Sequence, residues 1–271
     1  MIGKTGGGKS AAGNTIVGKR VLRSSTSAVS QTKSCEKVLV TRGRNIEVID
    51  TPGILDTNKS ADSIKNEIAK CLKLSYPGPH VFLLVLQIGR FTKEEENSID
   101  ALEKLFGPLV SNYMIVLFTH GDQLKGKSIV EFIQSGHPKL RQLIDRCGNR
   151  FHVFNNKKKC KRFQVVELIK KIDELVEENG RQPFGEEMYE EMWQSEERQV
   201  GDTKREDKPT EEHLPLTSSF MADLLQKMIL FQATLAATDR TNTDDDPGQS
   251  VAPTDSHLYL SEAKSVIETA P

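Results

Sequence analysis

The glycine-rich stretch GKTGGGKS at positions 3–10 constrains the chain more than any other part of the sequence. It matches the phosphate-loop pattern of a glycine, four free positions and then Gly-Lys-Ser. Glycines let successive backbone N–H groups point into one concavity that cradles phosphate oxygens. Lys9 would bring a positive charge to the β- and γ-phosphates, and the Ser10 hydroxyl would be a ligand of Mg²⁺. We therefore predict a nucleotide-phosphate site, the alternative being a chance glycine-rich loop. Its residues are Gly3, Lys4, Thr5, Gly6, Gly7, Gly8, Lys9, Ser10 and Ala11.

The stretch before this loop is too short for the fold that the loop implies. A phosphate loop follows a buried central strand of about five apolar residues, but only Met1 and Ile2 precede Gly3. Losing such a strand removes several large buried side chains, each worth roughly 1.5–3 kcal/mol, from a total stability of about 5–15 kcal/mol. We expect that Met1 is a truncated or misassigned start of a longer chain, and that nucleotide binding could be impaired without this strand.

The composition argues against several functional classes. The 37 basic and 38 acidic residues nearly cancel, so no nucleic-acid partner is expected. No signal peptide opens the sequence, and no uncharged run of about 18 apolar residues occurs. We therefore expect a cytoplasmic protein. The cysteines are far apart and form no CxxC pair, which argues against a zinc site and a disulfide framework and suits a reducing compartment. They are Cys35, Cys71, Cys147 and Cys160.

Apolar runs alternate with amphipathic segments along the first two thirds of the chain. Val81–Ile88 is continuously apolar, as expected for a parallel strand covered on both faces, whereas Ile64, Ile68 and Leu72 recur at helical spacing. This alternation predicts an α/β fold with a doubly wound, mostly parallel sheet and flanking helices. The other predicted strands are 37–41, 46–50, 113–119 and 151–154, the first two joined by a hairpin turn, and the predicted helices are 9–18, 60–75, 93–106, 128–145 and 165–175.

The character of the sequence changes toward the C-terminus. We predict a nucleotide-binding domain at 1–182, a helical extension at 183–200, and a linker with a disordered tail at 201–271. Residues 220–237 carry an apolar stripe that could dock on the domain, on a partner helix or on a bilayer surface. The stripe consists of Leu224, Met228, Phe231 and Leu235. A separate basic run at 157–162 is either a solvated loop or a contact for an anionic membrane.

Two further segments fit around a nucleotide's phosphates. Asp50 ends an apolar strand, where a carboxylate can hold a Mg²⁺-bound water, and Gly53 offers an N–H to the γ-phosphate with no side chain in the way. Thr32 lies in the Ser/Thr-rich segment 20–35. In nucleotide switches, a threonine in such a loop reaches Mg²⁺ and the γ-phosphate when the triphosphate is bound. We predict Ser10, Thr32 and Asp50 as the metal-site residues. The alternatives are that residues 50–53 form an ordinary Asp-Thr-Pro-Gly turn, and that Thr32 is one of many Ser and Thr residues in its segment and has no role of its own.

The segment Thr119–Asp122 follows the predicted strand 113–119 and carries a candidate base site. A carboxylate at Asp122 can accept hydrogen bonds from the ring N–H and the exocyclic amine of guanine, a donor pair that adenine lacks. The usual guanine-binding motif begins with Asn where this chain has Thr119. We predict Thr119, His120 and Asp122 as base-site residues that favour GTP and GDP over ATP. The alternative is a polar loop that closes the strand.

Six segments occur in order over residues 3–156: GKTGGGKSAAGNTIVGK (3–19), TKSC (32–35), DTPGILDT (50–57), GPHVFLLVLQIGRFTKEEE (78–96), VLFTHGDQL (116–124) and RCGNRFHVFNN (146–156). Together they resemble the GIMAP family, the immunity-associated GTPases of the septin-related branch of phosphate-loop GTPases. Members of that family also carry Thr at the position of Thr119. The resemblance implies that residues 1–182 are an AIG1-type GTP-binding domain. It also implies that Asn155, or a backbone group beside it, meets the guanine carbonyl.

The resemblance further implies that such proteins pair through their nucleotide faces, as homodimers or as heterodimers with related GTPases. Ile54 stands where Ras-like enzymes carry a water-orienting Gln, so intrinsic hydrolysis should be slow. Arg90 is a candidate catalytic residue that would act across such a dimer by neutralising charge on the transferred phosphoryl group, alongside Lys9 of the loop. The alternative is that Arg90 forms an ion pair within Glu94–Glu96.

Two functions fit these expectations. The first is a guanine-nucleotide switch that binds GTP or GDP with Mg²⁺, assembles when loaded with GTP, and resets by slow, dimerisation-dependent hydrolysis. The second is a non-hydrolysing scaffold, stabilised by GTP, on an intracellular membrane. Some members of the resembled family have membrane-anchoring C-terminal segments, which implies possible peripheral contact with an internal membrane. A hydrolysis rate that rises with protein concentration would distinguish the switch from the scaffold.

Overall fold

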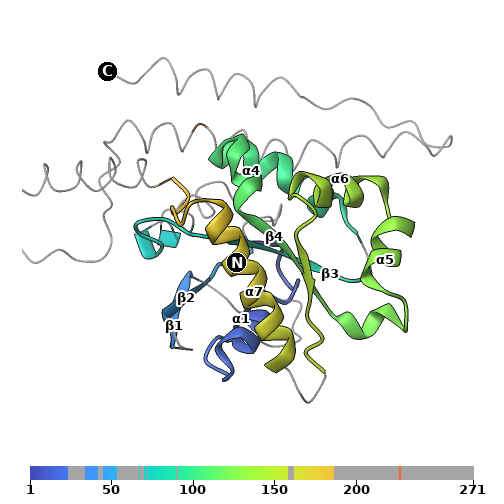
Figure 1. Ribbon diagram of the computed structural model, residues 1–271, viewed down its shortest axis with the longest axis horizontal. Helices are drawn as coiled ribbons and strands as arrows, with labels where there is room; N and C mark the ends of the chain where they lie inside the picture. The colour runs from blue at the N-terminus through green and yellow to red at the C-terminus, as the bar shows by residue number, and fades with distance from the viewer. Residues whose placement is uncertain are drawn as a thin grey trace, which may run out of the picture. The chain divides into compact units, whose positions relative to one another are not determined.

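The computed structural model describes residues 1–23, 34–41, 45–53, 67, 70–71, 73–89, 91–157, 162–185 and 226 (Figure 1). Several of the sequence predictions fall outside these residues. They concern Thr32, Ile54, Arg90, the helix at 60–75 for the most part, and nearly all of 183–271. The chain divides into two compact units, Met1–Thr238 and Asp239–Pro271, and the second lies wholly outside the described residues. The domain boundaries at 182 and 200 therefore stay predictions.

Helices and strands alternate along the described part of the chain. In order they are α1 (Lys9–Val17), β1 (Glu36–Thr41), β2 (Asn45–Asp50), β3 (Phe82–Gln87), α3 (Lys93–Glu96), α4 (Ser98–Phe106), η1 (Pro108–Tyr113), β4 (Met114–Thr119), η2 (Gly121–Leu124), α5 (Ile129–Ser135), α6 (Pro138–Arg146), β5 (Phe151–Val153) and α7 (Arg162–Glu178). The predicted helix at 128–145 is divided in two, because Pro138 lacks a backbone N–H and opens a new helix instead of continuing the old one.

The strands β3, β4 and β5 form a parallel sheet in that order. In β4 all six residues are buried, and in β3 all but the last are buried. Such continuous burial is what a parallel strand needs when helices cover both of its faces. The predicted doubly wound α/β fold with flanking helices is therefore confirmed.

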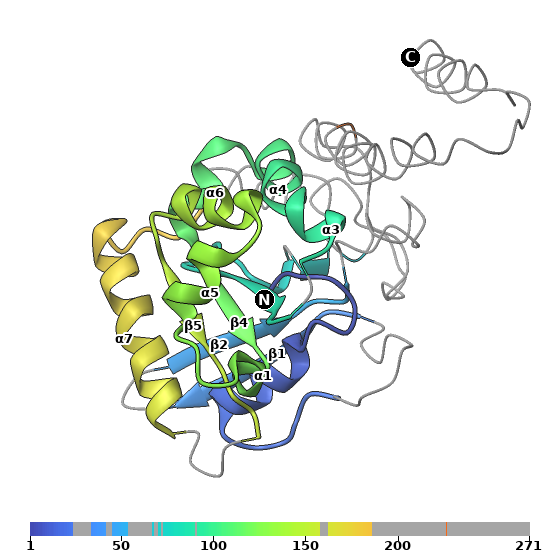
Figure 2. The ribbon, with the colours of Figure 1, turned by 90° about the vertical axis from the view of Figure 1, so that its right-hand side faces the viewer.

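Two apolar cores lie on opposite faces of this sheet. On one face Leu84 and Val116 pack with residues of α4, α5 and α6, and on the other Val85 and Leu117 pack with residues of α1 and α7. Figure 2 shows α4 and α6 on one side of β4 and α1 on the other. Successive residues of each strand therefore serve opposite cores, which fixes the strands relative to the loops at their ends.

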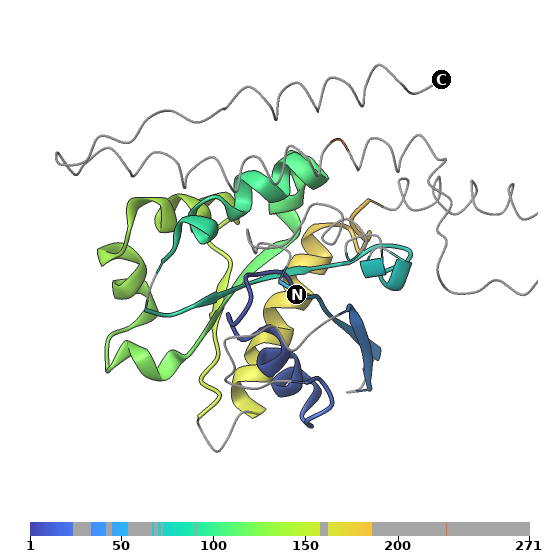
Figure 3. The same cartoon turned by 180° about the vertical axis from the view of Figure 1, so that it is seen from behind.

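The hairpin formed by β1 and β2 is a separate antiparallel sheet, in register from the Glu36–Asp50 pair to the Thr41–Asn45 pair. Among the residues that the structure describes, Met1 and Ile2 lie between β2 and β3 (Figure 3). The amino group of Met1 donates to the carbonyl of Ile49 over 2.8 Å, and Ile2 forms a parallel bridge with Leu84. In the described part of the chain, the place of a strand between β2 and β3 is thus taken by one bridging residue, Ile2.

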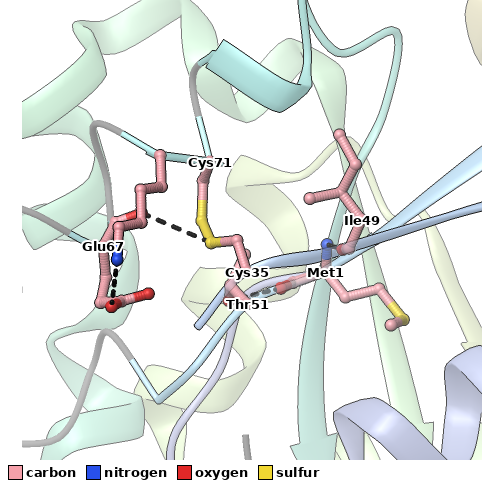
Figure 4. Close-up of a disulfide and its surroundings, with 7 residues drawn as sticks. Met1, Cys35, Ile49, Thr51, Glu67 and Cys71 are labelled. Atoms are coloured by element: carbon pink, nitrogen blue, oxygen red, sulfur yellow. Dashed lines mark hydrogen bonds and ion pairs between the residues drawn. A yellow bond between two sulfur atoms is a disulfide. The ribbon is translucent and has the colours of Figure 1, made fainter. Parts of the chain in front are cut away.

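The cysteine prediction needs a correction. The sequence argued against a disulfide framework, but the structure joins Cys35, just before β1, to Cys71 (Figure 4). Their Cα atoms lie 5.6 Å apart, within the range of ordinary disulfides. Cys147 is a free, buried thiol. Spacing along the chain gave no sign of this pair, because the fold brings together residues 36 positions apart.

No helix within the described residues is long and apolar enough to cross a membrane.

Candidate phosphate and base site

The phosphate loop connects the bridging residue Ile2 to the first turn of α1. Gly6 and Gly8 have φ angles of 77° and 94°, in the left-handed region that favours glycine. Gly8 is the residue before the helix, so the backbone N–H groups of the first turn of α1 face the loop without a side-chain cap. This is the local geometry that binds phosphate oxygens at a helix N-terminus.

The side chain of Lys9 lies across this loop. Its Nζ atom donates to the carbonyl oxygens of Gly3 and Lys4, each over 2.9 Å, and the residue is only 6% exposed. A buried ammonium group needs such acceptors, because burial without them is costly. The contacts hold the positive charge at the loop that the sequence assigned to phosphate binding.

Ser10 and Asp50 meet beside Lys9. The Ser10 hydroxyl donates to Oδ2 of Asp50 over 2.5 Å, and Asp50 is 1% exposed. Burial raises the pKa of this carboxyl group, while the Ser10 hydrogen bond and the charges of the Met1 amino group and Lys9 oppose the rise. The pair comes from two segments 40 positions apart, and both residues belong to the metal site that the sequence predicted.

The residues at this point fit a Mg²⁺ ion. The Oδ1 atom of Asp50 is buried and accepts no hydrogen bond from the residues that the structure describes. An anionic oxygen left without a donor in a buried place suits a cation or a cation-bound water. Ser10 would be the ligand and Asp50 its outer partner, while the third predicted residue, Thr32, lies outside the described part of the chain.

Gly53 lies directly against the phosphate loop. A Cβ atom on Gly53 would come within 2.2 Å of the hydroxyl oxygen of Thr5 and 2.7 Å of its backbone nitrogen, so only glycine fits. The Thr5 hydroxyl is buried and has no hydrogen-bond partner within the described residues. A phosphate oxygen at the loop could satisfy the Thr5 hydroxyl.

Thr119 lies under the loop rather than in an open base site. The residue is fully buried, and its hydroxyl donates to the carbonyl of Gly7 at 2.8 Å and approaches that of Leu86 at 3.3 Å. His120, next in the chain, has a φ angle of 58° and places its Nδ1 atom 3.1 Å from the Thr119 hydroxyl oxygen. Thr119 therefore supports the phosphate loop from the end of β4.

Asp122 and Asn155 belong to neighbouring loops at the ends of β4 and β5. The N–H of Gly121 donates to the carbonyl of Phe154 over 3.0 Å, which joins the two loops. Asp122 forms a 2.5 Å ion pair with Lys157, and this hydrogen bond lowers the pKa of the carboxyl group. Asp122 thus stays anionic at neutral pH, the state that accepts two hydrogen bonds from guanine.

Several contacts around the site were missed by sequence reasoning. Gln164 of α7 holds the Asn155 backbone through its side-chain amide. Glu95, considered only as a partner for Arg90, is 1% exposed and lies 3.9 Å from Nζ of the loop residue Lys4. Its other oxygen accepts from the N–H and the hydroxyl of Thr92. These residues have no motif spacing that would have singled them out.

The Asp50–Gly53 segment follows the carboxyl end of β2, in the antiparallel hairpin. The phosphate loop follows Ile2, which pairs in parallel with β3, and the base-site loops follow β4 and β5 at the carboxyl edge of the parallel sheet. Ligands of doubly wound α/β proteins bind at this edge of the sheet. The fold and the site together define a phosphate-loop nucleotide-binding protein of the α/β class.

Comparisons with known proteins give the same result. The sequence model of the AIG1 family matches residues 1–204. Immune-associated nucleotide-binding protein 9 of Arabidopsis thaliana is 37% identical over 214 residues, which cover 76% of this chain and 62% of that protein. GTPase IMAP family member 8 of Homo sapiens is 38% identical over 184 residues, which cover 66% of this chain and 28% of that protein.

This chain belongs to the AIG1 family, and the resemblance to GIMAP proteins that the sequence motifs indicated is confirmed. Among solved structures, a dimerization-deficient mutant of Toc33 from Arabidopsis thaliana matches with a TM-score of 0.50 and 18% identity. The match covers 65% of this chain and 82% of that one, and it supports the fold. The chain spans 62% and 59% of the length of two Arabidopsis relatives.

Proposed function

We propose that this chain is a guanine-nucleotide switch that binds GTP or GDP together with Mg²⁺. The observation that carries the proposal is the 2.5 Å hydrogen bond between Ser10 and Asp50, with Oδ1 of the buried carboxylate accepting from no donor among the described residues. A hydroxyl and a carboxylate placed so at the start of a phosphate-loop helix suit a nucleotide-bound Mg²⁺ ion. Mg²⁺ would supply neutralisation of phosphate charge at this point.

The base preference rests on Asp122. Its carboxylate lies beside the loop of Asn155 at the far end of the same sheet edge, and both loops are fixed by backbone hydrogen bonds. An anionic acceptor pair complements the two adjacent donors of guanine, and adenine offers no such pair. The names of the relatives, a nucleotide-binding protein in Arabidopsis and a GTPase in human, agree with this chemistry.

We propose further that hydrolysis is slow and depends on pairing of two chains through their nucleotide faces. Lys9, held at the loop, can neutralise phosphoryl charge from within the chain. Arg90 is our candidate for a second cation supplied by a partner. A cytoplasmic location, with peripheral contact to an internal membrane through residues 220–237, completes the proposal.

The competing function is a scaffold that binds GTP without turning it over. It uses the same site, because nucleotide-dependent assembly needs only binding. Single-turnover hydrolysis measured across protein concentrations separates the two. The switch requires a rate that rises as chains pair and that falls in Arg90→Ala, whereas the scaffold requires a negligible rate at every concentration.

Binding itself is tested by titrating the chain with fluorescent GTP and ATP analogues, with and without Mg²⁺. We expect saturable, Mg²⁺-dependent binding of the guanine analogue, lost in Lys9→Ala and insensitive to Mg²⁺ in Ser10→Ala. Lys19→Ala, at an exposed position just past the end of α1, is the matched control. Equal affinity of the wild type and Lys9→Ala would refute the proposal.

A further inference from the structure

The side chain of Glu95, in the short helix α3, is buried although it carries a carboxylate. Only 1% of the residue is exposed. Its Oε2 atom accepts from the backbone N–H of Thr92 over 3.0 Å and from the Thr92 hydroxyl over 3.3 Å. Thr92 and Glu95 thus have the spacing and one of the two bonds of a capping box at the start of α3. A buried charge also needs an opposite charge nearby, so the cap alone does not account for the burial.

An opposite charge comes from Lys4 of the phosphate loop. Its Nζ atom lies 3.9 Å from Oε1 of Glu95. The same Nζ atom donates to the hydroxyl of Thr92 over 3.4 Å, across 88 positions of the chain. The side chain of Lys4 is 26% exposed and that of Glu95 is 1% exposed, so the pair is partly buried. Solvent and salt screen a partly buried pair much less than an exposed one, so the contact can hold the lysine in place.

The backbone of Lys4 is in turn a point at which the phosphate loop holds Lys9. The carbonyl oxygen of Lys4 accepts from Nζ of Lys9 over 2.9 Å and from the N–H of Gly7 over 3.3 Å. One carbonyl group therefore serves both the cation of the loop and a turn within the loop. A contact that restrains the side chain of Lys4 also restrains this carbonyl, because both belong to one residue. Glu95 thus lies at the end of a series of contacts that passes through Lys4 to Lys9.

We propose that Glu95 is a positioning residue for the phosphate loop. It holds the side chain of Lys4, and through the Lys4 carbonyl it keeps Lys9 where a nucleotide's phosphates would lie. The inference rests on the proposed function, because it concerns nucleotide binding at the same loop. A cation that is already ordered binds phosphate better than one that must be ordered on binding. Removal of the Glu95 charge therefore weakens nucleotide binding even where the helix cap is kept.

The test measures the affinity and the dissociation rate of a fluorescent GDP analogue, with Mg²⁺, for the 271-residue chain and its variants. Glu95→Gln keeps the length of the side chain and an oxygen that can cap Thr92, so a merely structural cap predicts unchanged affinity. We expect instead a loss of about tenfold, mainly through faster dissociation. Glu96→Gln is the matched control, because Glu96 of the same helix pairs with Lys139 of α6 over 3.4 Å. It should bind the analogue as the wild type does.

The double variant Lys4→Met/Glu95→Gln shows whether Glu95 acts through Lys4. If it does, the double variant binds no more weakly than the weaker of the two single variants, because the second change removes nothing further. Single losses that multiply in the double variant, or wild-type affinity in a folded Glu95→Gln, would overturn this inference alone. If Glu95→Gln does not fold, Lys4→Met decides: a loss of about tenfold supports the inference, and unchanged affinity overturns it. A wild type that binds no guanine nucleotide would overturn the proposed function as well.

Discussion

The hydroxyl of Thr119 donates a 2.8 Å hydrogen bond to the carbonyl of Gly7, 112 positions earlier in the chain. The contact joins the end of β4 to the phosphate loop, and both the donor and its surroundings are buried. Gly8 also packs closely against Thr119, because a Cβ atom on Gly8 would lie 3.1 Å from the Thr119 methyl group. The loop conformation therefore depends on a residue that also begins the predicted base-binding segment.

We expect Thr119→Val to weaken nucleotide binding. The substitution keeps the shape of the side chain but leaves the Gly7 carbonyl without its donor. This destabilises the binding-competent conformation of the loop by about 1–3 kcal/mol. Thr119→Ser keeps the hydroxyl and should bind nearly as the wild type does. Titration with a fluorescent GDP analogue measures the effect, and Thr41→Val at the exposed end of β1 is the control. Equal affinity of the valine and serine variants would contradict this role.

We expect Asp122→Asn to change the base that the protein prefers. Guanine offers two donors to the carboxylate, whereas xanthine offers one donor and one acceptor, which an amide complements. Loss of two hydrogen bonds to a charged acceptor costs about 3 kcal/mol, or roughly a hundredfold in affinity for GTP. Competition between GTP and xanthosine triphosphate measures the change.

The control for Asp122→Asn is Lys157→Ala. The side chain of Lys157 is 75% exposed, so its ion pair with Asp122 is screened by solvent and should alter GTP affinity by no more than about 1 kcal/mol. If Asp122→Asn retains its preference for GTP over the xanthine nucleotide, Asp122 is not the base-reading group.

The sequence predicted the parallel strands and the helix that follows the phosphate loop, for a physical reason, whereas the phosphate contacts themselves stay a prediction. Buried parallel strands leave continuous apolar runs, as in β3 and β4, and phosphate binding depends on glycines and a lysine at fixed spacing. The Ser10–Asp50 contact joins two residues that the sequence assigned to the metal site, one in the first turn of α1 and one at the end of β2.

Other features depend on long-range packing that leaves no local pattern. Thr119 was predicted in the base site, but the structure places its hydroxyl under the loop, since burial at the end of β4 turns it toward Gly7. The pairing of Cys35 with Cys71, 36 positions apart, depends likewise on how distant segments meet. Whether Thr32 and Arg90 join the site stays a prediction.

Acidification should destabilise the protein through His152. Burial, assisted by the charge of Lys171, lowers the pKa of this imidazole from 6.5 to about 4, although its hydrogen bond to the Gln164 carbonyl opposes the shift. Between these pH values the unfolded chain binds more protons than the folded one, so stability rises with pH across the window and is constant above it.

The pH effect of His152 is measured by chemical unfolding of the wild type and His152→Gln between pH 4 and 7. Glutamine can keep a donor near the Gln164 carbonyl but does not titrate. The wild type should lose on the order of 2 kcal/mol more than the variant on going from pH 6.5 to 4, with allowance for partial solvent exposure of the ring. Parallel pH profiles for the two proteins would exclude His152 as the source.

The Cys35–Cys71 disulfide should stabilise the oxidised protein measurably. The bond closes a loop of 36 positions that contains β1, β2 and the Asp50–Gly53 segment, and restricting an unfolded loop of this length is worth about 4 kcal/mol in the chain-entropy model. A reductant should therefore lower the midpoint of thermal unfolding of the wild type to that of Cys35→Ser or Cys71→Ser, and should leave those variants unchanged. Cys147→Ala is the control, because burial raises the pKa of that thiol to about 12 and it takes no part in the bond.

Thiol titration of the denatured, unreduced wild type should find two fewer reactive groups than after reduction. An equal count before and after reduction would show that the two sulfur atoms are not bonded in the purified protein.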